Sequence, residues 1–99
     1  MFARIHTLET TPEQFERGLE VVREELLPWA AESTGFRGLI GLTDRERGRT
    51  LVVTLWADQD ALDASAGPAD RLSRLASEFS GATRRALESY EVTLFDVKA

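Results

Sequence analysis

The chain has 99 residues, a length that suits one domain with one modest core. Its formal net charge of −5 and its pI near 4.8 argue against nucleic acid and anionic membrane surfaces as partners, because both favour basic patches. It contains no cysteine, which excludes disulfides and thiolate metal sites. No apolar run approaches the ~18 residues of a membrane span. The amino terminus lacks a signal-peptide pattern, so we expect a cytoplasmic protein.

The first two predicted elements are a short strand and an amphipathic helix. Residues 2–8 alternate as a strand, with His6 on one of its faces. The helix is expected to begin with Thr11 as N-cap, Pro12 in the first helical position and Gln14 completing a capping box. It should run to about residue 33. Its apolar stripe, at alternating spacings of four and three, consists of Phe15, Leu19, Val22, Leu26 and Trp29.

The middle of the chain is predicted to form a β-hairpin. Pro28 should bend the last turns of the first helix, and Gly35 is a suitable stop. Residues 36–42 then form a strand, and the charged turn 44–49 joins it to the strand 50–57.

Strand 50–57 is the densest β-branched and aromatic run of the chain, and we expect both of its faces to be covered. One face carries Leu51, Val53 and Leu55, and the other carries Thr50, Val52, Thr54 and Trp56.

The second half is predicted to contain two short helices and a last strand. Asp58 can cap a helix over 59–66 with Leu62 pointing inward, and Gly67-Pro68 is expected to break it. A further helix over 69–80 would place Leu72, Leu75, Ala76 and Phe79 on one side.

Arg84-Arg85 is expected in a connection, and residues 88–97 alternate as the last strand. The resulting order, β-α-β-β-α-β with a split second helix, is the ferredoxin-like α+β arrangement, with an antiparallel sheet covered by helices on one side. The other side carries Ile5, Leu51, Val53 and Leu55. That apolar patch exceeds what monomers usually expose, so we expect a homodimer in which two sheets face each other.

Four local signatures accompany this order of elements: Leu27-Pro28, Gly35-Phe36-Arg37-Gly38, Leu55-Trp56 and Asp60-Ala61-Leu62. Together they resemble the antibiotic biosynthesis monooxygenase domain family of dimeric α+β-barrel proteins, over residues 1–99 as a single domain. The resemblance implies a pocket between the sheet and the helices of each subunit. It also implies a choice of activities, because members include cofactor-free quinone-forming oxygenases, haem-degrading enzymes and proteins without known activity.

Carried over position by position, the resemblance assigns three candidate catalytic residues. Trp56 matches the pocket tryptophan of the family, His6 falls where the haem-degrading branch has an asparagine, and Arg74 falls near an arginine of the quinone-forming branch. Val52 and Leu62 depart from the quinone-forming branch, which has an asparagine and a tyrosine there.

The haem branch places an iron-ligating histidine on the split helix, whereas this chain has no histidine after His6. A single histidine without clustered carboxylates is also too few ligands to bind a non-haem metal well. We therefore expect neither a metal nor another cofactor.

Each candidate also has an ordinary structural interpretation. His6 is the only side chain suited to accept a proton near neutral pH, or it is a hydrogen-bonded strand histidine. Trp56 is a core anchor or a wall that stacks on a flat substrate. Arg74 lies opposite the apolar stripe of its helix, which favours a solvated charge, and Arg71 is better placed to reach a pocket. The residues expected to bind substrate, or otherwise to fill the core, are Phe15, Leu19, Val22, Trp29, Val52 and Leu62.

Three functions stay open. The first is a monooxygenase without metal or flavin that acts on a phenol, hydroquinone or anthrone-like ring, with His6 removing a proton. The second is a non-catalytic dimer that binds a small hydrophobic ligand or a partner protein, which Val52 and Leu62 favour. The third is haem degradation. An isomerase or dehalogenase-like role on the same scaffold also stays open.

Overall fold

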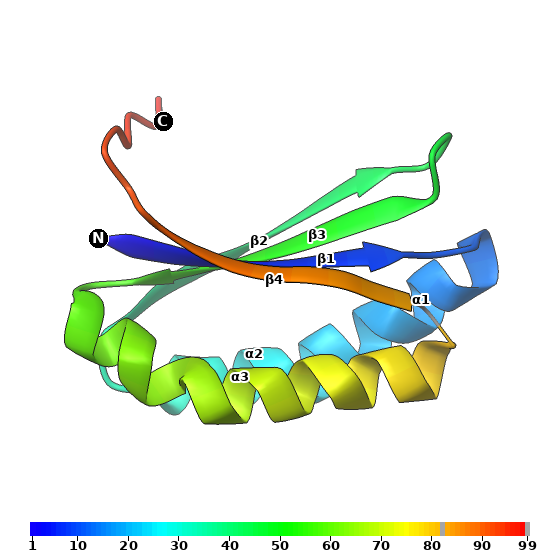
Figure 1. Ribbon diagram of the computed structural model, residues 1–99, viewed down its shortest axis with the longest axis horizontal. Helices are drawn as coiled ribbons and strands as arrows, with labels where there is room; N and C mark the ends of the chain where they lie inside the picture. Colours follow the sequence, from blue (N-terminus) through cyan, green and yellow to red (C-terminus); the bar gives the residue numbers. More distant parts are fainter. Residues whose placement is uncertain (82, 99) are drawn as a thin grey trace.

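A computed structural model of the protein describes residues 1–81 and 83–98, and the side chains of Ala76, Phe79 and Ser80 lie outside this description. Figure 1 shows a four-stranded sheet with all helices on one of its faces. The elements are β1 (Phe2–Glu9), α1 (Pro12–Val21), η1 (Val22–Leu26), α2 (Leu27–Glu32), β2 (Phe36–Asp44), β3 (Arg49–Trp56), α3 (Gln59–Ser80) and β4 (Thr83–Glu91). The predicted β-α-β-β-α-β order and the ferredoxin-like α+β class are confirmed.

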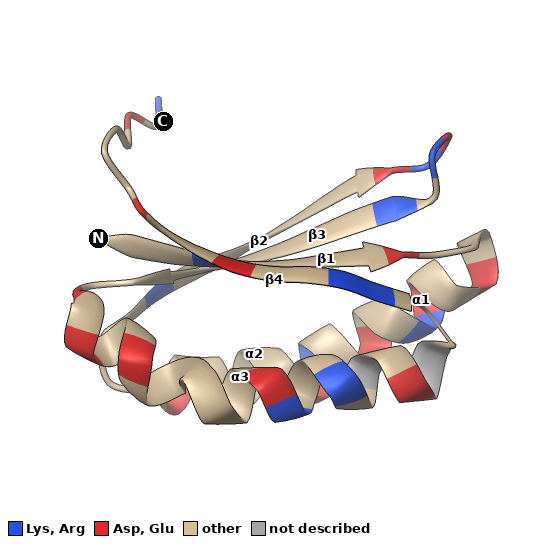
Figure 2. Cartoon of the chain, in the orientation of Figure 1, with Lys and Arg blue, Asp and Glu red and all other residues tan. Residues whose placement is uncertain are grey.

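The sheet is antiparallel, with the strand order β2-β3-β1-β4. Its register places Val52 of β3 directly between His6 of β1 and Gly41 of β2, so all three lie on the face toward the helices. The opposite face, called the open face below, carries Ile5, Ile40, Leu42, Leu51, Val53, Leu55 and Tyr90. Between their ends β2 and β3 carry almost no charge (Figure 2). The expected apolar second face of the sheet is therefore present.

The first helical region contains an irregularity that the sequence did not predict. Pro28 was expected to bend the helix, and the chain widens into the π-helical segment η1 just before it. The backbone N–H of Leu27 donates to the carbonyl of Val22, five residues back. A proline ring clashes with the carbonyl four residues before it, and a wider turn relieves that clash.

The second helix, α3, is one continuous element of 22 residues rather than two short ones. Pro68 lies inside it, and the first turns run at an angle to the rest (Figure 1). The residue before a proline avoids helical geometry partly because of its Cβ, and Gly67 has none, so the helix passes through the expected break as a bend. Leu75, expected to point inward, is 44% exposed, while Ala76 and Phe79 lie outside the described side chains.

The last strand begins and ends earlier than predicted. β4 starts at Thr83, so Arg84 and Arg85 belong to the strand rather than to a connection. Its pairing with β1 ends where Phe2 meets Glu91, followed by one backbone bond of 2.9 Å from the N–H of Val92 to the carbonyl of Met1. Residues 92–98 form no strand and turn away from the helices (Figure 1).

Gly35 lies where the end of α2 meets the start of α3. Its φ is +81°, which favours glycine, and a Cβ there would lie 2.5 Å from the Cβ of Ala61 in α3. Its carbonyl accepts a hydrogen bond of 2.7 Å from the N–H of Ala57, directly after β3. The start of β2 is thereby held against the start of α3.

None of the described helices combines the length and apolar character needed to cross a bilayer.

Candidate functional site

A cavity of about 310 Å³ lies between the first helical region and the helix-facing side of the sheet, and we call it the α1 cavity. Four of the residues expected to bind substrate line it: Phe15, Leu19, Val22 and Val52. Leu8, Leu27 and Leu39 extend its apolar wall, and its polar lining consists of Thr10, Gln14, Arg23, Thr43 and Thr50. Ligand pockets span roughly 300–1,000 Å³, so this cavity is large enough for a ligand of one or two rings.

The cavity exists because glycines stand where side chains from the helix and the strand would otherwise fill the space between them. Gly18 of α1 and Gly41 of β2 both line it, and a Cβ at Gly41 would find no atom within 4 Å. Gly41 therefore faces open space rather than a helix packed tightly against the strand. Val22 and Arg23 of the π-helical segment also line the cavity, and such widened turns are frequent at functional sites.

His6 points toward the helices, as expected, but it does not line the α1 cavity. It is 3% exposed, and its Nε2 has no hydrogen-bond partner. Burial lowers the pKa of His6 to about 4, assisted by the charges of Arg4 and Arg84 and opposed by Asp70. The imidazole is therefore neutral at pH 7 and lies on the strand next to Val52, one side chain away from the cavity.

Trp56 lies in an aromatic cluster at the other end of the helix layer. Its ring centroid is 5.5 Å from that of Phe36 and 6.0 Å from that of Trp29. The indole Nε1 donates a 3.0 Å hydrogen bond to Oγ1 of Thr54, so this donor is already engaged. Trp56 and Trp29 border a separate, smaller cleft of about 220 Å³, and neither lines the α1 cavity.

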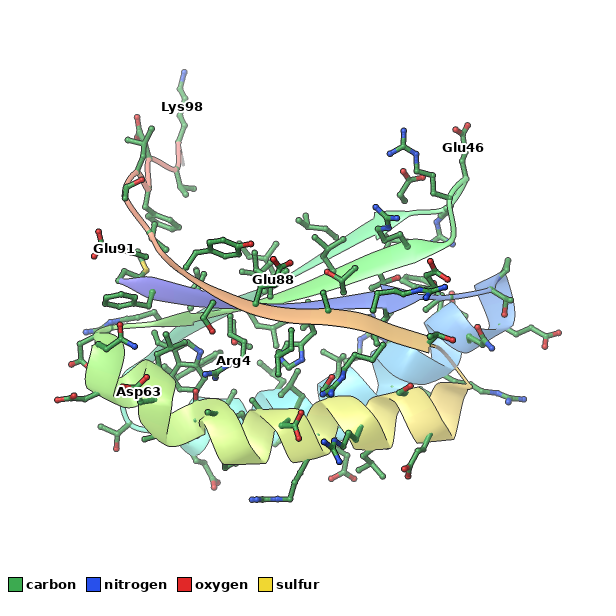
Figure 3. The ribbon with its side chains drawn as sticks, viewed as in Figure 1. Arg4, Glu46, Asp63, Glu88, Glu91 and Lys98 are labelled. Carbon is green, nitrogen blue, oxygen red and sulfur yellow. The ribbon has the colours of Figure 1, made fainter. Side chains whose placement is uncertain are left out.

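A buried arginine occupies the space between β1 and α3 (Figure 3). The guanidinium of Arg4 donates to Oγ of Ser65 and, at 2.8 Å, to the carbonyl of Leu62. Burial lowers the pKa of Arg4, and the negative charge of Asp63 raises it. Leu62, one of the expected binding residues, thus belongs to this packed region. The sequence analysis did not single out Arg4, although strand alternation places it on the same face as His6.

Arg74 lies on the outside of the molecule. Its side chain is 67% exposed and forms a 3.1 Å ion pair with Asp70, one turn earlier in α3. Asp70 also accepts a hydrogen bond from Arg84, which lowers the pKa of this carboxyl. Within residues 1–81 and 83–98, no group of three or more His, Asp or Glu side chains is arranged to hold a metal ion.

The expected site residues thus fall into three places: the α1 cavity, the packed region under α3, and, for Arg74, the surface. The hydroxyl residues Thr10, Thr43 and Thr50 also line the cavity, although no sequence motif marked them as candidates. Alternation put Thr50 on the same face as Val52, but only the strand register shows that Thr43 lies directly opposite it.

No family model matches the chain. Among curated proteins it is similar to the uncharacterized protein Rv2558 of Mycobacterium tuberculosis, with 30% identity over 95 residues. The alignment covers 95% of this chain but 39% of the relative, so the chain spans about two fifths of the length of this protein.

Solved structures with the same fold include several oxygenases. A protein of Deinococcus radiodurans, proposed to be an antibiotic biosynthesis monooxygenase, is 16% identical, with a TM-score of 0.74 over the full length of both chains. SnoaB, a cofactor-independent oxygenase of Streptomyces nogalater, is 13% identical with a TM-score of 0.72, covering 95% of this chain and 94% of its own. The monooxygenase ActVA-Orf6 of Streptomyces coelicolor, in complex with nanaomycin D, is 15% identical with a TM-score of 0.69, covering 99% and 90%. The resemblance noted in the sequence is therefore confirmed as a shared fold.

Proposed function

We propose that the protein is a monooxygenase that uses neither metal nor flavin and that oxidises a small aromatic molecule in the α1 cavity. The substrate is a phenol, a hydroquinone or an anthrone-like ring. The substrate loses two hydrogens and gains one oxygen atom from dioxygen, which gives a quinone, and the second oxygen atom leaves as water. Electrons pass from the deprotonated ring directly to dioxygen.

The observation that carries this proposal is the α1 cavity itself. Its wall is mainly apolar, it lies between sheet and helices, and its volume suits a flat ring. An apolar wall of this kind holds a flat ring in one orientation beside the sheet. Two oxygenases share the fold, and one of them is in complex with nanaomycin D, which supports the choice of a small-molecule oxidation.

His6 is the proposed proton acceptor, although its basicity limits the mechanism. A phenol with a pKa near 10 would give up its proton to an imidazole of pKa about 4 at a cost of about 8 kcal/mol. That is roughly half of the ~16 kcal/mol barrier that corresponds to about ten turnovers per second. Proton transfer to His6 is therefore compatible only with a slow enzyme or with a substrate more acidic than a simple phenol. The imidazole also has to reach past Val52 or Leu8.

A dimer that binds a small aromatic molecule without converting it is the second candidate. Among the described residues that line the α1 cavity there is no His, Asp or Glu, so no proton acceptor touches a bound ligand directly. Val52 and Leu62, where the quinone-forming branch has polar side chains, fit this alternative as well.

Oxygen uptake with a panel of hydroquinones and anthrones separates the two candidates. An oxygenase consumes dioxygen with at least one of these compounds, and His6→Ala lowers the rate roughly 100-fold, as expected for loss of a general base. Thr7→Ala, on the opposite face of the same strand, is the matched control and should keep the rate. Binding without oxygen uptake would leave the second candidate, and the absence of both would refute both.

We also propose that two chains pair through the open face. Ile40 and Leu42 are 43% and 50% exposed there, and the apolar tail residues Leu94, Phe95 and Val97 are exposed as well. The tail and the β2–β3 hairpin both curve away from the helices (Figure 1), so they border a shallow apolar surface that a second copy can cover. Sedimentation should give twice the mass of the 11.0 kDa chain, and Val53→Glu should give monomers. A wild-type monomer would contradict this pairing.

A further inference from the structure

The α1 cavity has two chemically different ends. Thr43 lies four residues from Leu39 along β2, about 13 Å at the usual rise of a strand. Thr50 lies directly opposite Thr43, and Thr10 lies next to Thr50 on its other side, and these three residues form what we call the hydroxyl end. The other end, next to Leu27 and Leu39, is apolar.

The strand register and one backbone hydrogen bond fix the hydroxyl end. Thr43 and Thr50 are direct cross-strand partners, which places their Cβ atoms about 4.5–5.5 Å apart. The hydroxyls of Thr10 and Thr50 are 3.3 Å apart and share one hydrogen bond. The N–H of Thr10 donates a 2.6 Å bond to the carbonyl of Gly48, which holds this residue against the hairpin.

The three hydroxyls retain capacity to bind a ligand, whereas the amide of the neighbouring Gln14 is held between two backbone groups. Gln14 accepts from the N–H of Thr11 at 2.9 Å and donates to the carbonyl of Gly81 at 2.8 Å. Each threonine hydroxyl has one donor and two acceptor positions. The single bond between Thr10 and Thr50 uses one donor and one acceptor, so donors and acceptors both remain.

We infer that the hydroxyl end binds the ring oxygen of the aromatic ligand, either a phenol hydroxyl or a quinone carbonyl. The ring then lies over Gly41 and Val52, and its oxygen-free side points toward Leu27 and Leu39. A threonine hydroxyl both donates and accepts, so the same end suits a phenol before oxidation and a quinone after it. In the reversed orientation the oxygen would lie next to Leu27 and Leu39, away from the three hydroxyls, and we expect this loss to cost about tenfold in affinity.

This inference rests on the proposed function for the position of the ligand in the α1 cavity, but it needs no turnover. Arg23, in η1, and the second amide N–H of Gln14 are the other donors of the lining, and Arg23 provides the competing assignment. The matched control is Thr7, which lies on the same strand as His6 but on the open face.

Equilibrium dialysis with 1-naphthol and naphthalene tests the inference, and the readout is the ratio of the two dissociation constants. We expect the wild-type protein to prefer 1-naphthol about tenfold. T43V and T50V each reduce this preference, the double variant removes it, and both R23M and T7V keep it. Valine preserves strand propensity, and each ratio is measured within one variant, so a change in stability alone does not alter it.

An unchanged preference in the double variant, or a loss of preference in R23M alone, would overturn the assignment to the hydroxyl end. Equal binding of both compounds to the wild type would do so too, while leaving the cavity as a binding site. If neither compound bound, the cavity-binding part of the proposed function would fall together with this inference. Oxygen uptake does not enter any of these outcomes.

Discussion

The helix layer covers the sheet in two halves that are packed in different ways. Under α3 the helix packs closely on the sheet except at the cleft of about 220 Å³ beside Trp56, and the polar side chains of Arg4 and His6 are buried there. Under α1 the wall residues Phe15, Leu19 and Val22 are only half-buried, and a cavity of about 310 Å³ remains. One half therefore contributes most to the stability of the fold, while the other keeps room for a ligand.

The difference has a sequence basis on both sides. The sheet-facing residues of α3 are mostly small, as at Ser65, Ala69 and Ser73, so the helix approaches the sheet closely around the long side chain of Arg4. On the α1 side, Gly18 and Gly41 have no side chains and lie between larger apolar residues, so the α1 cavity stays open between helix and sheet. We therefore expect ligand binding at the α1 cavity, where helix and sheet are incompletely packed.

Truncating one aromatic residue in each half gives the largest expected effect. Trp56→Ala should lower the free energy of unfolding by about 3–5 kcal/mol, because a fully buried indole is lost. Phe15→Ala should cost only about 1–2 kcal/mol, because Phe15 already faces a void. Urea unfolding at one fixed protein concentration measures both. Equal losses would show that the two halves are packed alike.

Protonation of His6 should weaken the packed half next. Because the folded-state pKa is about 4 and the unfolded value is 6.5, the unfolded chain binds this proton first. The contribution to stability is complete above pH 6.5 and falls by roughly 3 kcal/mol as the pH approaches the folded pKa.

Unfolding measured between about pH 5 and 6.5 tests this, since carboxylates titrate mainly below that range. In His6→Leu the slope of stability against pH should disappear from this range. A slope that persists in the variant would assign it to other groups.

The smallest expected effect concerns the start of α1. Thr11 caps this helix, and its side chain and that of Gln14 form the predicted capping box. Thr11→Ala should cost about 1 kcal/mol. We expect faster amide exchange in the first turn of α1, with the body of α3 unchanged, although Gln14 also donates to the carbonyl of Gly81 at the end of α3. Equal changes in both helices would show that the two halves do not open separately.

Local sequence signals predict much of this fold. The capping box locates the start of α1, and alternation in β1 and β3 separates the helix-facing side from the open face. These signals fail where a partner strand or a neighbouring residue determines where an element ends. β4 ends at Glu91 because β1 ends opposite it, although the alternating pattern continues further. Gly67 lets α3 continue through Pro68, which the proline alone would not suggest.

The site is less accessible to sequence reasoning than the fold. The apolar stripe of the first helix identifies Phe15, Leu19 and Val22 as residues that face the sheet, but periodicity cannot tell a filled interface from a hollow one. The hydroxyl end depends on the pairing of Thr43 with Thr50, which only the register reveals. His6 and Trp56 share a face with the cavity residues, yet neighbouring side chains separate them from it.

The most direct test of the α1 cavity as a ligand site is the binding of 1-naphthol to Gly41→Leu, with Ile40→Leu on the opposite face as the control. A side chain at position 41 enters open space, so the account predicts at least tenfold weaker binding while the free energy of unfolding stays the same or rises by about 1 kcal/mol. Unchanged affinity in a folded Gly41→Leu protein would contradict it.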